Sequence, residues 1–337
     1  MSGGPAKTKR VVIIGMGDTG VLVASRLSRD FQVTGISTKP NLVSGQELGK
    51  RLADLDWWQR FYNTPLHRFK ALSSIEIRHA KATSVDLDNQ TVTVLDQSKL
   101  ETRIPYDFLI IASGTSNGFW RDDSLRSEAD IDAQLQSDAR AISEARSIAI
   151  VGGGPCGVSS ALNIQRAYPD KSVSLFISAD LPLPGYHASA RQYYHQELIK
   201  VGVRLFTGHR AITPAPAPRA GTIHFESGQS AIADTIIWST GDRKPHTDFL
   251  PNELLDDEGF VKTRSTLEVR GRENVFAIGD VASTDPARSS ARNWAYGVLV
   301  HNLKRRAAGR AANKRYTPPA NRWGSIGGPQ DTGLTLH

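Results

Sequence analysis

The chain has 337 residues, of which 39% are hydrophobic and 22% are charged, an ordinary globular composition with room for two domains. Its single cysteine, Cys156, excludes an intrachain disulfide, and no apolar stretch is long enough for a membrane span. The net charge of +7 includes a basic cluster at 304–315, which we interpret as a solvated helix face or, alternatively, as a contact for an anionic membrane surface. We therefore expect a cytoplasmic protein, peripheral to a membrane in the second case, with no nucleic-acid partner and no metal site.

The first part of the chain predicts alternating strands and helices. Residues 10–37 read as strand, helix and strand, and apolar residues at spacings of three and four predict a helix from about Gly45 to Tyr62. Alternating residues on both sides of a turn at 88–90 predict a hairpin. An apolar strand then ends in the small-residue turn Ala112-Ser113-Gly114.

The second part repeats this pattern. A strand and a turn at 148–157 lead into a helix that ends near Tyr168, and the strand 172–178 follows. We expect a helix over about 189–200, several short strands, and a segment after residue 259 that returns the chain to the first domain. A final helix is predicted over about 289–306.

Two glycine-rich turns with the spacing G-x-G-x-x-G mark both halves. They comprise Gly15, Gly17 and Gly20, and Gly152, Gly154 and Gly157. Each turn lies between an apolar strand and a helix, where its first glycine permits a tight turn and its second admits a pyrophosphate. The third allows the helix to pack closely on the strand, and the helix N-terminus presents free N–H groups to the anion. The sequence therefore predicts two dinucleotide sites.

Five motifs in order resemble the FAD/NAD(P)-dependent pyridine nucleotide oxidoreductases over almost the whole chain. They are the two glycine turns, the stretch YDFLIIASGT, the strand TIIWSTGDRKP and the closing VFAIGD. The resemblance implies an α/β fold of two Rossmann-like, three-layer (β-β-α) domains, with the NAD(P)H domain (119–245) inserted into the FAD domain (1–118 and 246–337).

The same resemblance implies which residues contact each cofactor. For FAD they are Gly15, Gly17, Asp18, Thr19, Gly20, Ser37, Lys39, Ala112, Ser113, Gly114, Gly279 and Asp280. For NAD(P)H they are Gly152, Gly154, Pro155, Cys156, Gly157, Ser178, Arg191 and Gly241. Asp280 is implied to bind the ribityl–pyrophosphate region of FAD.

The chain departs from the family pattern at both ribose sites. The strand after the first turn ends at Ser37, without the acidic residue that binds the adenosine ribose, and Lys39 follows as a candidate phosphate contact. The matching strand in the second half ends at Ser178, also without an acid. This absence permits NADPH, with Arg191 as a candidate phosphate partner, whereas Asp180 two residues further on favours NADH.

The redox dithiol of the disulfide reductases is missing. The stretch NLVSGQELGKRL, in which those relatives carry C-x-x-x-x-C, holds no cysteine. The chain is thus most similar to the branch of type II NADH dehydrogenases and apoptosis-inducing-factor-like quinone reductases. The resemblance implies hydride transfer from NAD(P)H to flavin, then to a quinone-like or other small acceptor. The alternatives are a reductase for an iron–sulfur protein or monooxygenase, and a nucleotide-binding regulatory protein with little turnover.

No catalytic side chain follows from these motifs, because positioning of the two cofactor rings supplies most of the catalysis. Four residues that follow family motifs are candidates for the acceptor side of the site: Trp120, Arg292, Asn293 and Trp294. Structural packing is an equal alternative for each of them. The oligomeric state stays open.

Overall fold

Parallel strands form the centre of the first unit of the fold. The computed structural model describes residues 8–117, 122–241, 243–285 and 291–318, and structural statements below concern these residues. A seven-stranded sheet has the order β17-β8-β1-β2-β5-β6-β7. Its strands are β1 (Arg10–Ile14), β2 (Gln32–Ser37), β5 (Glu76–Asp86), β6 (Thr91–Asp96), β7 (Glu101–Pro105), β8 (Phe108–Ile111) and β17 (Val275–Ala277). β5 pairs in parallel with β2 and then antiparallel with β6.

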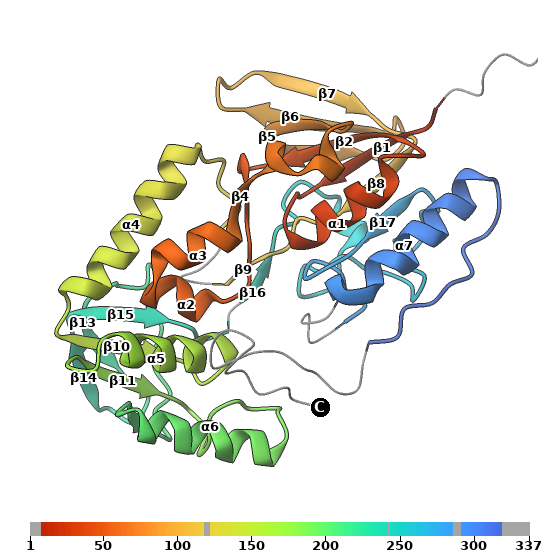
Figure 1. Ribbon diagram of the computed structural model, residues 1–337. Helices are drawn as coiled ribbons and strands as arrows, with labels where there is room; N and C mark the ends of the chain where they lie inside the picture. The colour runs from red at the N-terminus through yellow and green to blue at the C-terminus, as the bar shows by residue number, and fades with distance from the viewer. Residues whose placement is uncertain (1–7, 118–121, 242, 286–290, 319–337) are drawn as a thin grey trace, which may run out of the picture.

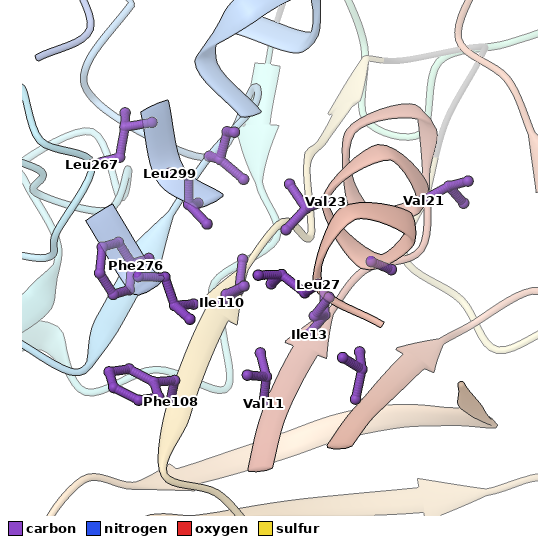
Figure 2. Close-up of a cluster of buried hydrophobic side chains, with 14 of the residues drawn as sticks. Val11, Ile13, Val21, Val23, Leu27, Phe108, Ile110, Leu267, Phe276 and Leu299 are labelled. Atoms are coloured by element: carbon purple, nitrogen blue, oxygen red, sulfur yellow. The ribbon is translucent and has the colours of Figure 1, made fainter. Parts of the chain in front are cut away.

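Two helices cover one face of this sheet. They are α1 (Asp18–Leu27) and α7 (Ala291–Ala307). Figure 2 shows the side chains of both helices meeting those of the strands, among them Ile13, Leu27, Ile110 and Leu299. All four are fully buried, and the removal of their apolar area from water stabilises the packing of the helices on the sheet.

The second unit contains a four-stranded parallel sheet of order β12-β11-β10-β15. Its strands are β10 (Ser147–Val151), β11 (Ser172–Phe176), β12 (Arg204–Phe206) and β15 (Thr235–Trp238). One face is covered by helices α5 (Pro155–Ala167) and α6 (Ala188–Lys200), and the other by the hairpin β13 (Gly221–His224) and β14 (Ser230–Ala233). The hairpin, sheet and helices form the predicted three layers (Figure 1).

The chain crosses between the units twice, side by side. The outward crossing, β9 (Thr115–Asn117), pairs antiparallel with the returning β16 (Arg243–Pro245). The returning chain then adds β17 next to β8. The α/β fold with one Rossmann-like unit inserted into the other is therefore as predicted, while the division at residues 118 and 246 stays a prediction.

One predicted helix was wrong. The segment from Gly45 to Tyr62 forms two helices, α2 (Leu48–Ala53) and α3 (Leu55–Tyr62), instead of one. The chain breaks at Asp54, whose φ of −153° is not helical and whose carboxylate accepts a hydrogen bond from the N–H of Trp57. An aspartate that caps a new helix competes with continuation of the old one, and the spacing of apolar residues does not detect this.

The two short helices fill the space between the units. α2 lies against α5, and Leu48 and Leu52 belong to the buried core of the second unit. α3 packs against α4 (Glu128–Glu144), which leads into β10, as Figure 1 shows. A segment of the first half of the sequence thus contributes to the core of the second unit. The remaining elements are β3 (Asn41–Val43), β4 (Asn63–Pro65) and the 3-10 helices Leu66–Arg68, Lys70–Leu72 and Asn252–Leu254.

Candidate functional site

In the first glycine turn, neighbouring backbone atoms lie close to the first and third glycines, whereas the second glycine has free space beside it. Gly15 has φ +101°, and a Cβ placed on it would lie 2.3 Å from the carbonyl oxygen of Ala112. A Cβ on Gly20 would lie 1.9 Å from the carbonyl oxygen of Gly15. A Cβ on Gly17 would meet no heavy atom of the described chain within 4 Å. Only the first and third glycines are therefore required by the protein's own packing.

The second turn repeats this geometry. Gly152 has φ +121°, and its Cβ would lie 2.1 Å from the carbonyl oxygen of Ser239. A Cβ on Gly157 would lie 2.0 Å from the carbonyl oxygen of Gly152, whereas one on Gly154 would again find nothing in the described part of the chain within 4 Å. In each unit the residue that follows the neighbouring parallel strand, β8 or β15, closes the turn, and both turns leave the second glycine open.

These open positions fit the phosphates of a dinucleotide. Gly17 and Gly154 are the N-caps of α1 and α5. Because glycine has no side chain, neither cap accepts a hydrogen bond from the first N–H groups of its helix. The first N–H groups of each helix therefore point toward the space beside the second glycine, together with the positive end of the helix dipole. Pro155, the first residue of α5, lacks an N–H that would have no helical partner at that position.

Gly279 and Asp280 lie beside the first turn. Gly279 has φ +83°, and a Cβ on it would lie 3.4 Å from Oγ1 of Thr19. This contact places the half-buried Asp280 next to the N-terminus of α1. Asp18, by contrast, has its carboxylate turned to the segment before α2, where it accepts hydrogen bonds from Oγ of Ser44 (2.7 Å) and N of Gly45 (3.0 Å).

The turn Ala112-Ser113-Gly114 is held by His246, a residue that the sequence analysis missed. Ser113 Oγ donates to the carbonyl of His246 at 2.7 Å, and the ring nitrogen Nδ1 of His246 lies 3.0 Å from the carbonyl oxygen of Ser113. The N–H of His246 also donates to the carbonyl of Gly114, which has φ +73°. The only signal in the sequence was a histidine directly after the returning strand.

Burial lowers the pKa of His246, opposed by its hydrogen bond to Ser113 and by the charge of Asp123. In the neutral ring Nδ1 donates to the carbonyl of Ser113, which leaves Nε2 without a proton, and Nε2 has no hydrogen-bond partner among the described residues. The unfolded chain therefore takes up a proton near pH 6.5 more readily than the folded protein. We expect stability to fall as the pH drops below about 6.5.

Thermal unfolding at pH 7.5 and pH 5.5 tests this expectation. The loss of melting temperature on acidification should be smaller in His246→Asn, which keeps a donor for the carbonyl of Ser113 but does not titrate. An equal loss in both proteins would assign the acid sensitivity to other groups.

Both predicted adenosine-ribose residues, Ser37 and Lys39, make hydrogen bonds within the protein. Ser37 is buried, and its hydroxyl donates to the carbonyl of Lys39 at 2.6 Å. Nζ of Lys39 reaches the segment before α4 and donates to the carbonyl of Asp122 at 3.0 Å. The N–H of Arg126 also bonds Thr38, so this segment lies across the end of β2. Their roles toward a cofactor stay predictions.

Two residues predicted for the second ribose site lie exposed on the loop after β11. Ser178 and Asp180 are exposed after β11, and the guanidinium of Arg191 donates to the carbonyls of Leu181 and Pro182 at 3.2 Å each. Arg191 therefore holds the loop that borders this site. Its preference between NADH and NADPH stays a prediction.

The other two predicted residues lie at the edges of the second turn. The single cysteine, Cys156, is half-buried in the first turn of α5, and its carbonyl accepts a hydrogen bond from Ser160. Gly241 lies two residues beyond Ser239, whose carbonyl adjoins Gly152, and has φ +86°. Both therefore border the glycine turn, and their contacts with NAD(P)H stay predictions.

The acceptor-side candidates are only partly placed. Trp120 lies outside the described residues, and the side chains of Arg292 and Asn293 on α7 are not described. Trp294, on the same helix, is 38% exposed. In the basic cluster, Lys304 pairs with Asp30 at 2.6 Å, and Arg306 pairs with Glu268 and Glu273. Two of its charges are thus balanced within the protein, and a membrane contact through 304–315 stays a prediction.

Within the residues that the structure describes, no helix combines the length and the apolar character that a membrane span requires.

Most of the chain matches one known protein family. The family model described as pyridine nucleotide-disulphide oxidoreductase matches residues 9–298. Oxidoreductase ptaL of Pestalotiopsis fici is 27% identical, over 82% of this chain and 78% of its own. Ferroptosis suppressor protein 1 of Xenopus laevis is 23% identical (92% and 84%), and apoptosis-inducing factor homolog A of Dictyostelium discoideum is 22% identical (87% and 75%).

A solved structure agrees with the fold. Reduced CoADR-RHD of Bacillus anthracis superimposes with a TM-score of 0.76 at 16% identity, covering 96% of this chain. The present chain spans 61% of that protein, so the likeness concerns the two dinucleotide-binding units. The predicted oxidoreductase class and the two cofactors, FAD and NAD(P)H, are confirmed by the family match, and the chain belongs to the pyridine nucleotide-disulphide oxidoreductase family.

Proposed function

We propose that this protein transfers a hydride from NAD(P)H to FAD and passes the electrons to a quinone-like or other small acceptor, without a redox disulfide. The observation that supports this most directly is the pair of glycine turns in which only Gly17 and Gly154 are open. Two such positions in one chain can hold two dinucleotides end to end. When bound, FAD supplies a group that accepts a hydride and returns electrons to a second substrate.

The protein itself supplies positioning. The glycine turns would hold the pyrophosphates, and Gly279-Asp280 adjoins the first of them through Thr19. The segment before α2 is fixed by Asp18 and by the indole N–H of Trp58, which donates to the carbonyl of Gln46 at 2.9 Å. A rigid site of this kind holds two reacting rings at a fixed separation and needs no acid or base of its own.

The absence of a dithiol restricts the acceptor. Cys156 lies on α5 within the second turn, and it is the only cysteine of the sequence. In the place where the disulfide reductases carry their dithiol, α2 packs tightly on α5: a Cβ on Gly49 would lie 2.3 Å from Oγ of Ser159. Electrons must therefore leave for an acceptor outside the chain rather than for an internal disulfide.

NADPH is the favoured donor within this proposal. The strand that precedes the second ribose site ends without an acid at Ser178, and Arg191 borders the same loop. A carboxylate there would repel a 2′-phosphate, whereas an arginine attracts it. Asp180 is the residue that opposes this preference, because it is exposed on the same loop.

Anaerobic stopped-flow mixing of the yellow holoprotein with NADH and NADPH tests the proposal. We expect rapid bleaching of the flavin absorbance, faster with NADPH, followed by reoxidation when a water-soluble quinone is added. Bleaching without quinone turnover would favour an iron–sulfur protein or monooxygenase partner. Absence of bleaching with both nucleotides would contradict the catalytic function and favour a regulatory role.

A further inference from the structure

The second unit contains a cavity on the sheet face opposite α5. Its volume is about 470 Å³, within the range of small-molecule sites. Sheet residues such as Ser174 and Phe176 line one side, and the hairpin strand β14 lines the other. Ser147, at the amino end of β10, also lines it, about 16 Å along the strand from Gly152 at about 3.3 Å per residue. This end of the cavity is therefore remote from the glycine turn. At the other end the carbonyl of Phe176 accepts a hydrogen bond from the N–H of Gly152 at 2.9 Å, but the cavity lies on the hairpin face of the sheet, opposite α5.

Aromatic rings form one end of this cavity. Phe176 and Phe206 are stacked with ring centroids 4.7 Å apart and planes 13° apart. His209 meets the ring of Phe225 edge-on, with centroids 5.1 Å apart. All four rings line the cavity. Faces and edges of this kind favour a flat, unsaturated occupant, because ring stacking adds to the burial of apolar area.

The described residues that line the cavity include a positively charged side chain, Arg204, and no acidic one. Arg204 lies on β12 directly opposite Ser174 in the sheet register, and its side chain is exposed. Within the described part of the chain Arg204 has no ion-pair partner, and no aspartate or glutamate is among the lining residues. A guanidinium without a counter-ion beside an aromatic wall suits a carboxylate, which it binds through two parallel hydrogen bonds.

From these features we infer that the cavity is a binding site for a flat aromatic monocarboxylate, distinct from the two dinucleotide sites. The ring of the ligand lies against the phenylalanine cluster and its carboxylate against Arg204. The second sheet, its hairpin and His209 build the cavity, and none of the described residues assigned above to a cofactor or to the electron acceptor lines it.

Titration calorimetry of the holoprotein with 2-naphthoate, with and without saturating NADP⁺, tests the inference. We expect one binding site per chain that is retained in the presence of NADP⁺. Arg204→Gln should weaken binding by about tenfold or more, the effect expected for loss of a charged hydrogen bond. Arg140→Gln, which removes an exposed arginine of α4 outside the cavity, should bind as the wild type does.

A second variant tests whether the ligand occupies the cavity, without changing the charge of Arg204. Ala231→Phe adds a ring to a half-buried cavity wall and should abolish binding while Arg204 remains in place. Melting temperatures establish that each variant is folded. No binding by the wild type, loss of binding with NADP⁺, or unchanged binding in folded Arg204→Gln or Ala231→Phe protein would each overturn the inference.

Discussion

Gly154→Glu is expected to give a folded, yellow protein that neither NADH nor NADPH reduces. The backbone of Gly154 has φ −74° and ψ 177°, which any residue adopts, and its Cβ would meet no described atom within 4 Å. The protein without nucleotide therefore tolerates the side chain, and a carboxylate at the N-terminus of α5 is favourable for the helix. The same carboxylate occupies the space that a pyrophosphate needs and repels it.

Gly17→Glu is the matched variant. Its backbone (φ −77°, ψ −168°) and empty surroundings are the same, so the chain should fold, but it should purify without flavin. Absorbance of the purified protein and stopped-flow reduction distinguish the two variants. If Gly154→Glu lost the flavin and Gly17→Glu kept it, the assignment of the two cofactors to the two units would be reversed.

Asp138→Ala is expected to lower the free energy of unfolding by about 3–5 kcal/mol, the cost typical of breaking a buried ion pair. Asp138 on α4 is 3% exposed and lies 3.6 Å from the guanidinium of Arg51, which is 6% exposed on α2. Its other oxygen pairs with Arg219 at 2.5 Å, and Gln134 donates to the same oxygen at 2.8 Å. Loss of the aspartate removes the carboxylate that faces the buried guanidinium of Arg51. Denaturant unfolding of the holoprotein measures the effect.

The double variant Arg51→Met with Asp138→Leu tests whether the loss of stability comes from the unbalanced charge or from lost packing. It removes both buried charges and keeps similar volumes, and replacement of a buried ion pair by apolar side chains is often neutral. We expect most of the lost stability to return. A double variant as unstable as Asp138→Ala would mean that packing, rather than an uncompensated charge, determines the loss.

The buried pair also bears on function. Arg51 belongs to α2, in the segment where the family resemblance places the dithiol of the disulfide reductases. By joining α2 to α4, the pair fixes this helix against the second unit, where Leu48 and Leu52 pack. A fixed α2 suits a protein whose catalysis depends on the relative position of two cofactors rather than on a moving disulfide.

The sequence by itself determined the two glycine turns, the order of strands and helices around them, and the absence of a dithiol. These features are local. A turn between a strand and a helix depends on glycine spacing and on apolar runs within about twenty residues, and both can be counted along the chain. The family resemblance rested on the same short motifs, and for that reason the fold class, cofactors and oxidoreductase class were predicted correctly.

Only the tertiary structure decided what connects the two units. Whether α2 continues into α3 depended on the cap at Asp54, and its packing on α5 depended on Ser159, more than one hundred residues away. Arg51 met Asp138 across 87 positions, and His246 met Ser113 across 133. Contacts of this kind depend on how two sheets and the helices between them are placed in space. No periodicity or spacing along the chain records that placement, because tertiary neighbours need not be sequence neighbours.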